Sequence, residues 1–400
     1  SCLPLDNRSS VTALYRHCRC TGHEEPVARD LTDRFIHDNH LRPPCLRTLE
    51  LFLTYRCNLA CTYCFVRGKN RGWDMDQATA RAALRFAFTQ RDKAPEFSIV
   101  FMGGEPLLCY DLIKEFVPFA LSRARKQATK LRFDMTTNGT LLTDDMAQFL
   151  AENKVRLLLS IDGGQETHDR HRVHGDGSGS FADALRAADL IKRHQGFLGA
   201  KITTMPRAAA DLVDDTRELH GFGFRFFIIG YATGESWDGE HFKRYLHSLG
   251  DLHSWCRSLP AKERPRITTL DRLLQNQAGR MHHWGCRAGA TGVAVAPNGE
   301  IFPCSKVLGT RDGKGIMRLG TLAEGWTANH LRLRLSGLHP EDRPQCWNCF
   351  HYPFCRGWCY AVNYEETGNP FRSGDSCRLQ GQTGAYKRHL RRKTRSSGLI

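Results

Sequence analysis

The segment Cys57-Asn58-Leu59-Ala60-Cys61-Thr62-Tyr63-Cys64 places three cysteines within eight residues. Thiolates at such close spacing are typical metal ligands. On a four-iron, four-sulfur cluster, three of them leave one iron without a protein ligand, and that iron can bind a chelating group from outside the protein. A zinc ion is the alternative, and it would need a fourth ligand from elsewhere in the chain. The segment alone therefore predicts a metal site and leaves two metals open.

Strand-like apolar runs alternate with helical patterns on both sides of this segment. Asp76 is placed to cap a helix that runs to Gln90, and Thr143 to cap another. Ser180 and Asp183 have the spacing of a capping box for a helix that ends at Gln195-Gly196. The alternation favours βα units around a parallel sheet. The predicted strands are Thr48–Thr54, Phe97–Met102, Leu131–Thr136, Val155–Ile161, Ala200–Met205 and Phe224–Ile229.

Polar or glycine-rich loops follow the first four of these strands. They are the cysteine segment, Gly103-Gly104-Glu105-Pro106, Thr137-Asn138-Gly139 and Ser160-Ile161-Asp162-Gly163. In a parallel barrel the loops after the strands share one rim, where such folds place their chemistry. Ordinary βα turns would explain the glycines but not the cysteines, so we expect the four loops to form one site.

The cysteine segment resembles the signature of the radical S-adenosylmethionine (SAM) superfamily, Cys-x3-Cys-x-aromatic-Cys, with Tyr63 at the aromatic position. The resemblance implies a four-iron, four-sulfur cluster on Cys57, Cys61 and Cys64. It also implies reductive cleavage of SAM to methionine and a 5′-deoxyadenosyl radical, which removes a hydrogen atom from a substrate. The cofactor carries this step, and the protein positions the reactants and excludes water.

The same resemblance assigns contacts to SAM. Gly103, Gly104 and Glu105 correspond to the segment that holds the SAM amino group, and Tyr63 offers a face to the adenine. Ser160, and Arg172 twelve residues later, correspond to the pair that binds the SAM carboxylate. A guanidinium suits that role because it can grip a carboxylate with two parallel hydrogen bonds.

Seven further cysteines lie near the carboxyl end. Their spacing resembles the SPASM domain, an extension that holds two auxiliary four-iron, four-sulfur clusters; a zinc knuckle is the alternative. The resemblance assigns Cys286, Cys304 and Cys359 to the first auxiliary cluster and Cys346, Cys349, Cys355 and Cys377 to the second. The first set has three ligands, which predicts an open iron. His282, His283, another cysteine or a substrate thiolate are candidates to fill it.

Composition limits the cellular setting and the partners. Sixteen cysteines without a visible secretion signal indicate metal ligands in a cytoplasmic protein, and no apolar run approaches the roughly 20 residues of a membrane helix. The net charge of +15 favours anionic partners. No RNA-binding motif accompanies that charge, so we do not expect nucleic acid to be a partner.

These observations predict a partial (β/α)6 barrel, similar to a TIM barrel, followed by a small cysteine-rich SPASM domain. Only 56 residues precede Cys57, which is short for a complete peptide-recognition domain. The predicted segments are an N-terminal extension (1–45), the barrel (46–235), a helical linker (236–283), the SPASM domain (284–382) and a basic tail (383–400).

The resemblance points to a peptide-modifying oxidoreductase, and three interpretations remain. In the first, the enzyme installs a cross-link in a ribosomally made peptide, with flavodoxin or ferredoxin as electron donor. In the second, it is an anaerobic sulfatase-maturating enzyme, but such enzymes carry a catalytic Asp where this chain has Ser305. A serine cannot replace that base near neutral pH without an activating partner. The third, from another class, is a basic zinc protein that binds nucleic acid.

Overall fold

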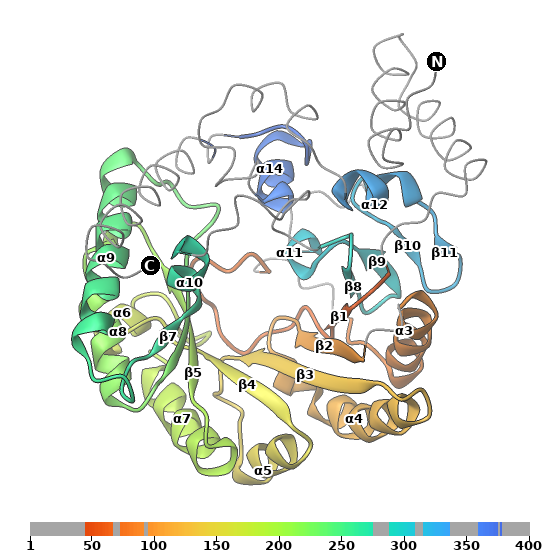
Figure 1. The fold of residues 1–400 in the computed structure, drawn as a ribbon, viewed down its shortest axis with the longest axis horizontal. Helices are drawn as coiled ribbons and strands as arrows, with labels where there is room; N and C mark the ends of the chain where they lie inside the picture. Colours follow the sequence, from red (N-terminus) through yellow and green to blue (C-terminus); the bar gives the residue numbers. More distant parts are fainter. Residues whose placement is uncertain are drawn as a thin grey trace.

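One curved sheet of eleven strands organises the fold, in the order β11-β10-β9-β8-β1-β2-β3-β4-β5-β6-β7. The computed structural model describes residues 45–66, 73–91, 95–274, 288–308, 315–336, 359–374 and 377. Figure 1 shows the strands curving around a central space, with the helices on the outer side. The partial barrel predicted from the sequence is present.

Six parallel strands form the barrel wall, and each corresponds to a predicted strand with slightly displaced ends. They pair in chain order, β1 with β2 and so on to β6. Parallel strands buried on both faces need apolar residues at most positions, and the predicted runs supplied them. The strands are β1 (Thr48–Phe52), β2 (Glu96–Met102), β3 (Lys130–Thr137), β4 (Val155–Ser160), β5 (Gly199–Thr204) and β6 (Phe226–Tyr231).

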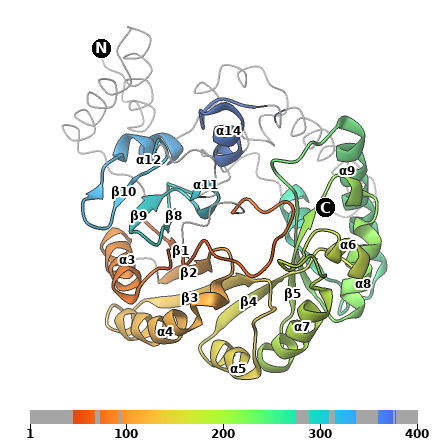
Figure 2. The ribbon, with the colours of Figure 1, turned by 180° about the vertical axis from the view of Figure 1, so that it is seen from behind.

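Helices connect these strands and cover their outer face (Figure 2). They are α3 (Gln77–Gln90), α4 (Tyr110–Arg125), α5 (Asp144–Glu152), α6 (Gln165–Asp169), α7 (Phe181–Gln195), α8 (Leu212–Gly221) and α9 (Gly239–Ser258), with the short 3-10 turns η1 (Pro106–Cys109) and η2 (Arg207–Ala209). The expected caps of α3 and α5 form. The Asp76 side chain accepts a hydrogen bond from the Thr79 amide, and the Thr143 side chain accepts one from the Met146 amide.

The predicted capping box at α7 is wrong. Ser180 is the N-cap residue, but its side chain makes no capping hydrogen bond. Its hydroxyl donates instead to the Arg172 carbonyl oxygen at 2.8 Å, and Asp183 lies 3.1 Å from His174 Nε2. Both side chains contact the preceding loop, and the Ser180 hydroxyl does not cap the backbone of the helix. The end of α7 is as predicted, with Gly196 in the left-handed conformation at φ 65°.

The C-terminal part of the chain extends the same sheet. Strand β8 (Gly292–Val295) pairs in parallel with β1, and β9 (Glu300–Phe302), β10 (Gly320–Thr321) and β11 (Gly325–Trp326) follow in antiparallel order. On the other edge, β7 (Arg266–Ile267) pairs with β6 and lies in the segment expected to be a helical linker. The remaining helices in the described part of the chain are α10 (Thr268–Leu274), α11 (Ser305–Leu308), α12 (Asn329–Ser336) and α14 (Tyr360–Thr367).

The inner face of the barrel is partly apolar and partly charged. Leu49 and Leu51 of β1 belong to the main core, so the intervening Glu50 points to the inner side. A separate inner cluster consists of Phe52, Val66, Ala294, Ala296 and Leu308. No helix among the described residues is both long and apolar enough to cross a membrane.

Candidate active site

The cysteine loop follows β1 and is bound to the segment that precedes α7. The Ala60 amide donates to the Val173 carbonyl oxygen at 2.7 Å, and the Thr62 amide to that of His171 at 3.0 Å. Leu59 forms a β-bridge with His174. These backbone contacts hold the loop beside the rim of β4, so the residues expected to bind SAM from two distant parts of the chain are brought together.

The three thiols of the loop are free and differ in exposure: Cys57 is exposed, Cys61 buried and Cys64 half-buried. Loss of hydration is the largest cause that raises the pKa of Cys57 to about 12, and the charges of Glu105, Cys61 and Cys64 act in the same direction. Burial also raises the pKa of Cys61. Three thiolates that disfavour one another's charge fit a cationic iron–sulfur cluster, because the irons supply the positive charge that stabilises them.

Gly103 and Gly104 pack against the backbone of the residues that lead into this loop. The Gly104 amide donates to the Thr54 carbonyl oxygen at 2.8 Å, and the Glu105 amide to that of Arg56 at 2.9 Å. A Cβ atom at Gly104 would lie 2.1 Å from the Arg56 carbonyl oxygen. Glycine is therefore required here because the backbone before Cys57 packs directly onto it.

Glu105 joins the loops after β2 and β3. Its carboxylate accepts hydrogen bonds from the Leu107 amide at 3.0 Å, the Thr137 hydroxyl at 2.7 Å and the Asn138 amide at 2.8 Å. Burial nevertheless raises its pKa. Three protein donors already hold this carboxylate, so its position is fixed before any ligand binds.

Asn138 continues this network to the first cysteine. Its Nδ2 atom lies 3.8 Å from Cys57 Sγ and donates to Asn58 Oδ1 at 3.0 Å. Its Oδ1 atom accepts from the backbone amide and the hydroxyl of Thr140. The loop after β3 thus contributes a hydrogen-bond donor to a predicted cluster ligand.

Asp162 is the centre of the charged part of the site. Its carboxylate accepts from Arg172 Nε at 2.9 Å, Arg172 Nη2 at 3.1 Å, the Thr203 amide at 2.8 Å and the Tyr63 hydroxyl. The Arg172 guanidinium also lies over the Tyr63 ring, 5.4 Å from its centre. Despite the cost of burying a cation, the Asp162 charge beside it raises the pKa of Arg172, which stays protonated.

A buried histidine, His168, contacts the backbone amide of Asp162. The Ser180 hydroxyl gives its proton to the Arg172 carbonyl oxygen, so His168 Nε2, 3.0 Å away, must be the donor in its contact with Ser180. His168 Nδ1 is then free to accept from the Asp162 amide at 3.4 Å. Burial and the charge of Arg172 lower the pKa of His168 to about 4, in agreement with a neutral ring.

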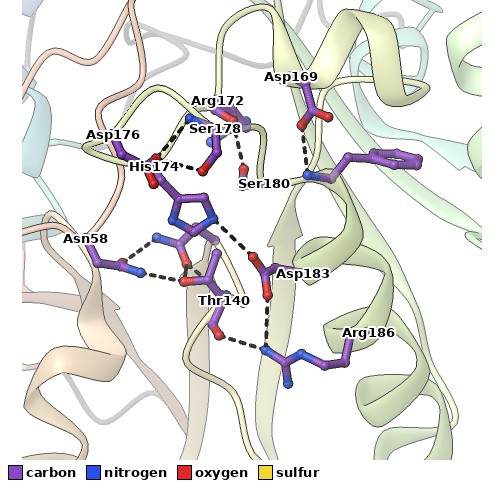
Figure 3. Close-up of polar contacts among 12 residues, drawn as sticks. Asn58, Thr140, Asp169, Arg172, His174, Asp176, Ser178, Ser180, Asp183 and Arg186 are labelled. Carbon is purple, nitrogen blue, oxygen red and sulfur yellow. Dashed lines mark hydrogen bonds and ion pairs between the residues drawn. The ribbon is translucent and has the colours of Figure 1, made fainter.

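Figure 3 shows polar contacts within the segment 169–183, together with those that join the loop after β3 to Asn58 of the cysteine loop and to Arg186 of α7. Asn58 Nδ2 donates to the Thr140 hydroxyl at 2.6 Å, and Arg186 Nη2 donates to the Thr140 carbonyl oxygen at 2.7 Å. The Asp169 carboxylate accepts from the Phe181 amide at 2.8 Å. Asp169 therefore ties the loop carrying Arg172 to the start of α7, and the loop after β3 is tied to both the cysteine loop and α7.

Ser305, which stands where the resemblance gives sulfatase-maturating enzymes a catalytic Asp, lies beside a carboxylate. Its amide donates to Glu50 Oε2 at 2.8 Å. Burial raises the pKa of Glu50, although hydrogen bonds from the Ser305 backbone and side chain and the charge of Lys201 act in the opposite direction. The serine therefore has an acidic neighbour on β1, which its sequence context did not indicate.

The structure places the predicted residues of the barrel at one rim. Tyr63 and Arg172 meet at Asp162, and Ser160 ends the strand that leads to it. Of the predicted auxiliary ligands, Cys304 follows β9, Cys359 is the N-cap residue of α14, and Cys377 is half-buried. The predictions for Cys286, Cys346, Cys349 and Cys355, for His282 and His283, for residues 1–44 and for the basic tail lie outside the described residues.

The sequence reasoning missed Glu50, Lys201 and the role of Asp162. Each is a charged residue on, or directly after, a strand that is otherwise largely apolar. A charge at an inward-facing strand position is costly unless it has a function or a partner, and this was the available signal.

Comparisons with known proteins identify a family for the barrel that carries this site. Residues 51–219 match the Radical SAM superfamily. The mycofactocin maturase MftC of Mycobacterium tuberculosis is 28% identical over 92% of this chain and 91% of its own length. The cysteine-type anaerobic sulfatase-maturating enzyme of Clostridium novyi is 24% identical over 76% of this chain and 84% of its own length.

Solved structures show the same fold. The enzyme anSMEcpe with bound AdoMet superposes with a TM-score of 0.70 at 21% identity, over 87% of this chain and 98% of its own. SuiB of Streptococcus suis, bound to its precursor peptide SuiA, gives a TM-score of 0.62 at 17% identity, over 88% of this chain and 79% of its own. Residues 51–219 of this chain are therefore a radical SAM domain.

Proposed function

We propose that this protein is a SPASM-type maturase that removes a hydrogen atom from a peptide and installs a cross-link in it. The product would be a thioether or a carbon–carbon or carbon–oxygen bond in a ribosomally made peptide. The observation that carries the proposal is the junction of the cysteine loop with the Asp162–Arg172 pair, which places predicted cluster ligands beside predicted SAM contacts. The similarity to MftC over 92% of the chain supports a peptide substrate.

The family implies SAM and one four-iron, four-sulfur cluster, and Cys57, Cys61 and Cys64 would hold the cluster. When bound, the cluster supplies the electron that cleaves SAM. Among the described residues, no set of three His, Cys, Asp or Glu side chains converges on a point as ligands of a single metal ion do. Cluster thiolates bind separate irons and do not have to converge in this way.

The chain's own groups would orient SAM. The backbone of Gly103 and Gly104 would face its amino group, while Glu105 fixes the loop through its three hydrogen bonds. Asp162 occupies Nε and Nη2 of Arg172, which leaves Nη1 for the SAM carboxylate beside Ser160. The Tyr63 ring, held by its hydroxyl and by Arg172, would contact the adenine.

The proposed auxiliary clusters belong to the C-terminal part. Cys304 and Cys359 both pack against the main core, so these two predicted ligands of the first cluster are held by ordered structure. A flavodoxin or ferredoxin would supply electrons to the enzyme. Iron and sulfide analysis of the reconstituted protein tests the cluster count, since three four-iron clusters require about 12 irons per chain.

Maturation of a sulfatase is the second candidate, and the Glu50–Ser305 contact favours it. The Glu50 carboxylate lies 2.8 Å from the amide of Ser305, and residue 305 is the position that those enzymes give to an Asp. The missing acid at residue 305 therefore does not exclude this activity. The similarity to sulfatase-maturating enzymes, at 24% identity for that of Clostridium novyi, also keeps it open.

Co-expression with candidate peptides separates the two functions. The chain is expressed with each short peptide that its neighbouring genes are found to encode, and separately with a sulfatase-derived peptide that contains a Cys or Ser target. A cross-link appears as the loss of two hydrogen atoms with fragmentation blocked between the joined residues. A formylglycine appears as an aldehyde that reacts with a hydrazide probe. A Cys61→Ala variant is the control. If the wild-type enzyme modifies neither type of peptide, the proposal is contradicted.

A further inference from the structure

Glu50 is a carboxylate on the inner face of β1. Its neighbours Leu49 and Leu51 belong to the main core, so the side chain between them points into the barrel. Its register partners on the two adjacent strands are Val100 of β2 and Ala294 of β8. Residues in register share a face of the sheet, so Glu50 stands between two apolar side chains. A carboxylate in such surroundings is costly unless it has a partner or a function.

The groups that act on the Glu50 carboxylate leave room for a further hydrogen-bond donor. Within the described part of the chain they are Ser305 of α11, whose amide donates to Oε2 at 2.8 Å, and Lys201 of β5, whose charge attracts the carboxylate. A carboxylate has about four lone-pair sites, and Ser305 does not fill them. The Glu50 side chain is half-buried, so a molecule inside the barrel can reach it.

Glu50 lies on the path between two predicted cluster sites. In one direction, β1 continues through Phe52 into the loop that carries Cys57. In the other, the amide that Glu50 binds belongs to the residue after Cys304, a predicted ligand of the first auxiliary cluster. A substrate side chain that enters the barrel between these sites therefore meets this carboxylate.

Formation of a thioether in a peptide removes two hydrogens, and only one of them leaves as an atom. The other leaves the cysteine thiol as a proton, which needs an acceptor. A carboxylate with an ordinary pKa of about 4.3 is a weak base for a thiol, whose pKa is about 8.5. Burial raises the pKa of Glu50, which narrows this gap and makes the carboxylate a better base. A hydroxyl or a C–H group is far less acidic than a thiol, so a carboxylate suits a cysteine best.

We propose that Glu50 binds the thiol of a substrate cysteine inside the barrel and accepts its proton as the sulfur bonds to the substrate carbon. The S–H bond breaks, and its proton moves to the Glu50 carboxylate. The C–S bond forms with the carbon radical that hydrogen-atom removal leaves. The one electron that remains passes to an oxidant of the iron–sulfur cluster class. The inference rests on the proposed function and narrows its product to a thioether.

The test separates hydrogen-atom removal from bond formation. Reconstituted protein reacts with SAM, dithionite and a synthetic copy of the peptide that co-expression shows to be cross-linked. Mass spectrometry measures 5′-deoxyadenosine and the thioether peptide. Glu50→Gln should form 5′-deoxyadenosine at the wild-type rate but the thioether about 100- to 10,000-fold more slowly, the usual contribution of a general base. Raising the pH from about 7 to about 9 should restore much of the thioether in this variant, because the thiol then ionises without a base. Glu50→Asp, which keeps a shorter carboxylate, should fall between the two.

Asp134→Asn is the matched control. Asp134 is in register with Val100 and so shares the inner face with Glu50, but Arg132 and Arg156 already pair with it. This variant should keep the wild-type ratio of thioether to 5′-deoxyadenosine. Iron content and melting temperature show that each variant folds and carries clusters, and Glu50→Leu replaces the Gln variant if that one does not.

Three results would overturn the inference and leave the proposed function intact. The first is an unchanged ratio of thioether to 5′-deoxyadenosine in Glu50→Gln. The second is a loss of thioether in that variant that higher pH does not relieve, which would give Glu50 a structural role. The third is a wild-type cross-link in a peptide without cysteine. A wild-type protein that modifies no peptide would overturn the proposed function itself.

Discussion

Arg172 and Asp162 form a bidentate ion pair in which Nε lies 2.9 Å from Oδ2 and Nη2 3.1 Å from Oδ1. The two side chains are 9% and 2% exposed. A buried pair of this kind costs hydration on both partners, so its value lies in the geometry it imposes rather than in net stability. Here the Asp162–Arg172 pair fixes the position of the Tyr63 ring on one side and of the residues that end β4 on the other.

The Asp162→Asn substitution should reduce the free energy of unfolding by about 3–5 kcal/mol, because it leaves the Arg172 charge buried without its counter-ion. Urea unfolding of the full chain measures the change. Asp134→Asn is the matched control: Asp134 also forms ion pairs with arginine, but its partners Arg132 and Arg156 are 50% and 48% exposed. That surface network should contribute about 1 kcal/mol or less. A similar loss in both variants would contradict the role of burial.

Gly104→Ala should prevent normal assembly of the cysteine loop. The added Cβ would lie 2.1 Å from the Arg56 carbonyl oxygen, and a backbone atom cannot move aside as a flexible side chain can. We expect the reconstituted variant to lose the iron that Cys57, Cys61 and Cys64 would bind, which iron analysis measures. Gly175→Ala is the control, since no atom lies within 4 Å of its Cβ position. A Gly104→Ala protein with full iron content would show that the loop tolerates displacement.

Asn138→Leu should lower the reduction potential of the cluster held by Cys57. An N–H donor 3.8 Å from Cys57 Sγ stabilises negative charge on the sulfur, and hydrogen bonds to cluster sulfurs tune the potential. A redox titration followed by electron paramagnetic resonance measures the shift. Asn58→Leu breaks the contacts of Asn58 with Asn138 and Thr140 but keeps the donor to sulfur, so its potential should stay near the wild-type value. An equal shift in both variants would assign the effect to loop packing.

The strands and the rim loops could be predicted because their signals are local. Apolar runs such as Phe97–Met102 indicate strands by composition, and Asp76 and Thr143 cap their helices as the sequence suggested. The order of the cysteine segment, the Gly103–Gly104 turn and Ser160 along the chain was enough to place them on one rim, because loops after parallel strands share an edge.

Partner choice could not be predicted, because it depends on distances between residues far apart in the chain. Ser180 fits the local rule for a cap, yet its hydroxyl donates to Arg172, eight residues earlier. Ser305 gave no indication of Glu50, which is 255 residues away. The continuation of the sheet from β1 to β8 was hidden for the same reason, since the two strands are separated by the whole barrel.

Two buried groups near the rim should give opposite pH dependences of stability. Burial raises the pKa of Asp215 to about 6, although its Oδ1 accepts from the Gly164 amide at 2.9 Å. Burial lowers the pKa of His168 to about 4. Between about pH 4 and 6 the folded state retains a proton on Asp215 that the unfolded chain has lost, so this contribution to the free energy of unfolding falls as pH rises. In the same window only the unfolded chain protonates His168, so its contribution rises with pH.

Each slope is about 1.4 kcal/mol per pH unit, and the two nearly cancel in the wild-type protein. Asp215→Asn, which keeps an acceptor for Gly164, should therefore gain about 3 kcal/mol relative to wild type between pH 4 and pH 7. His168→Gln, which keeps a donor and an acceptor, should change by a similar amount in the opposite direction over this range. Urea unfolding at a series of pH values measures both differences. If either difference were constant with pH, that group would have the same pKa in the folded and unfolded chain, and its burial would not govern its protonation.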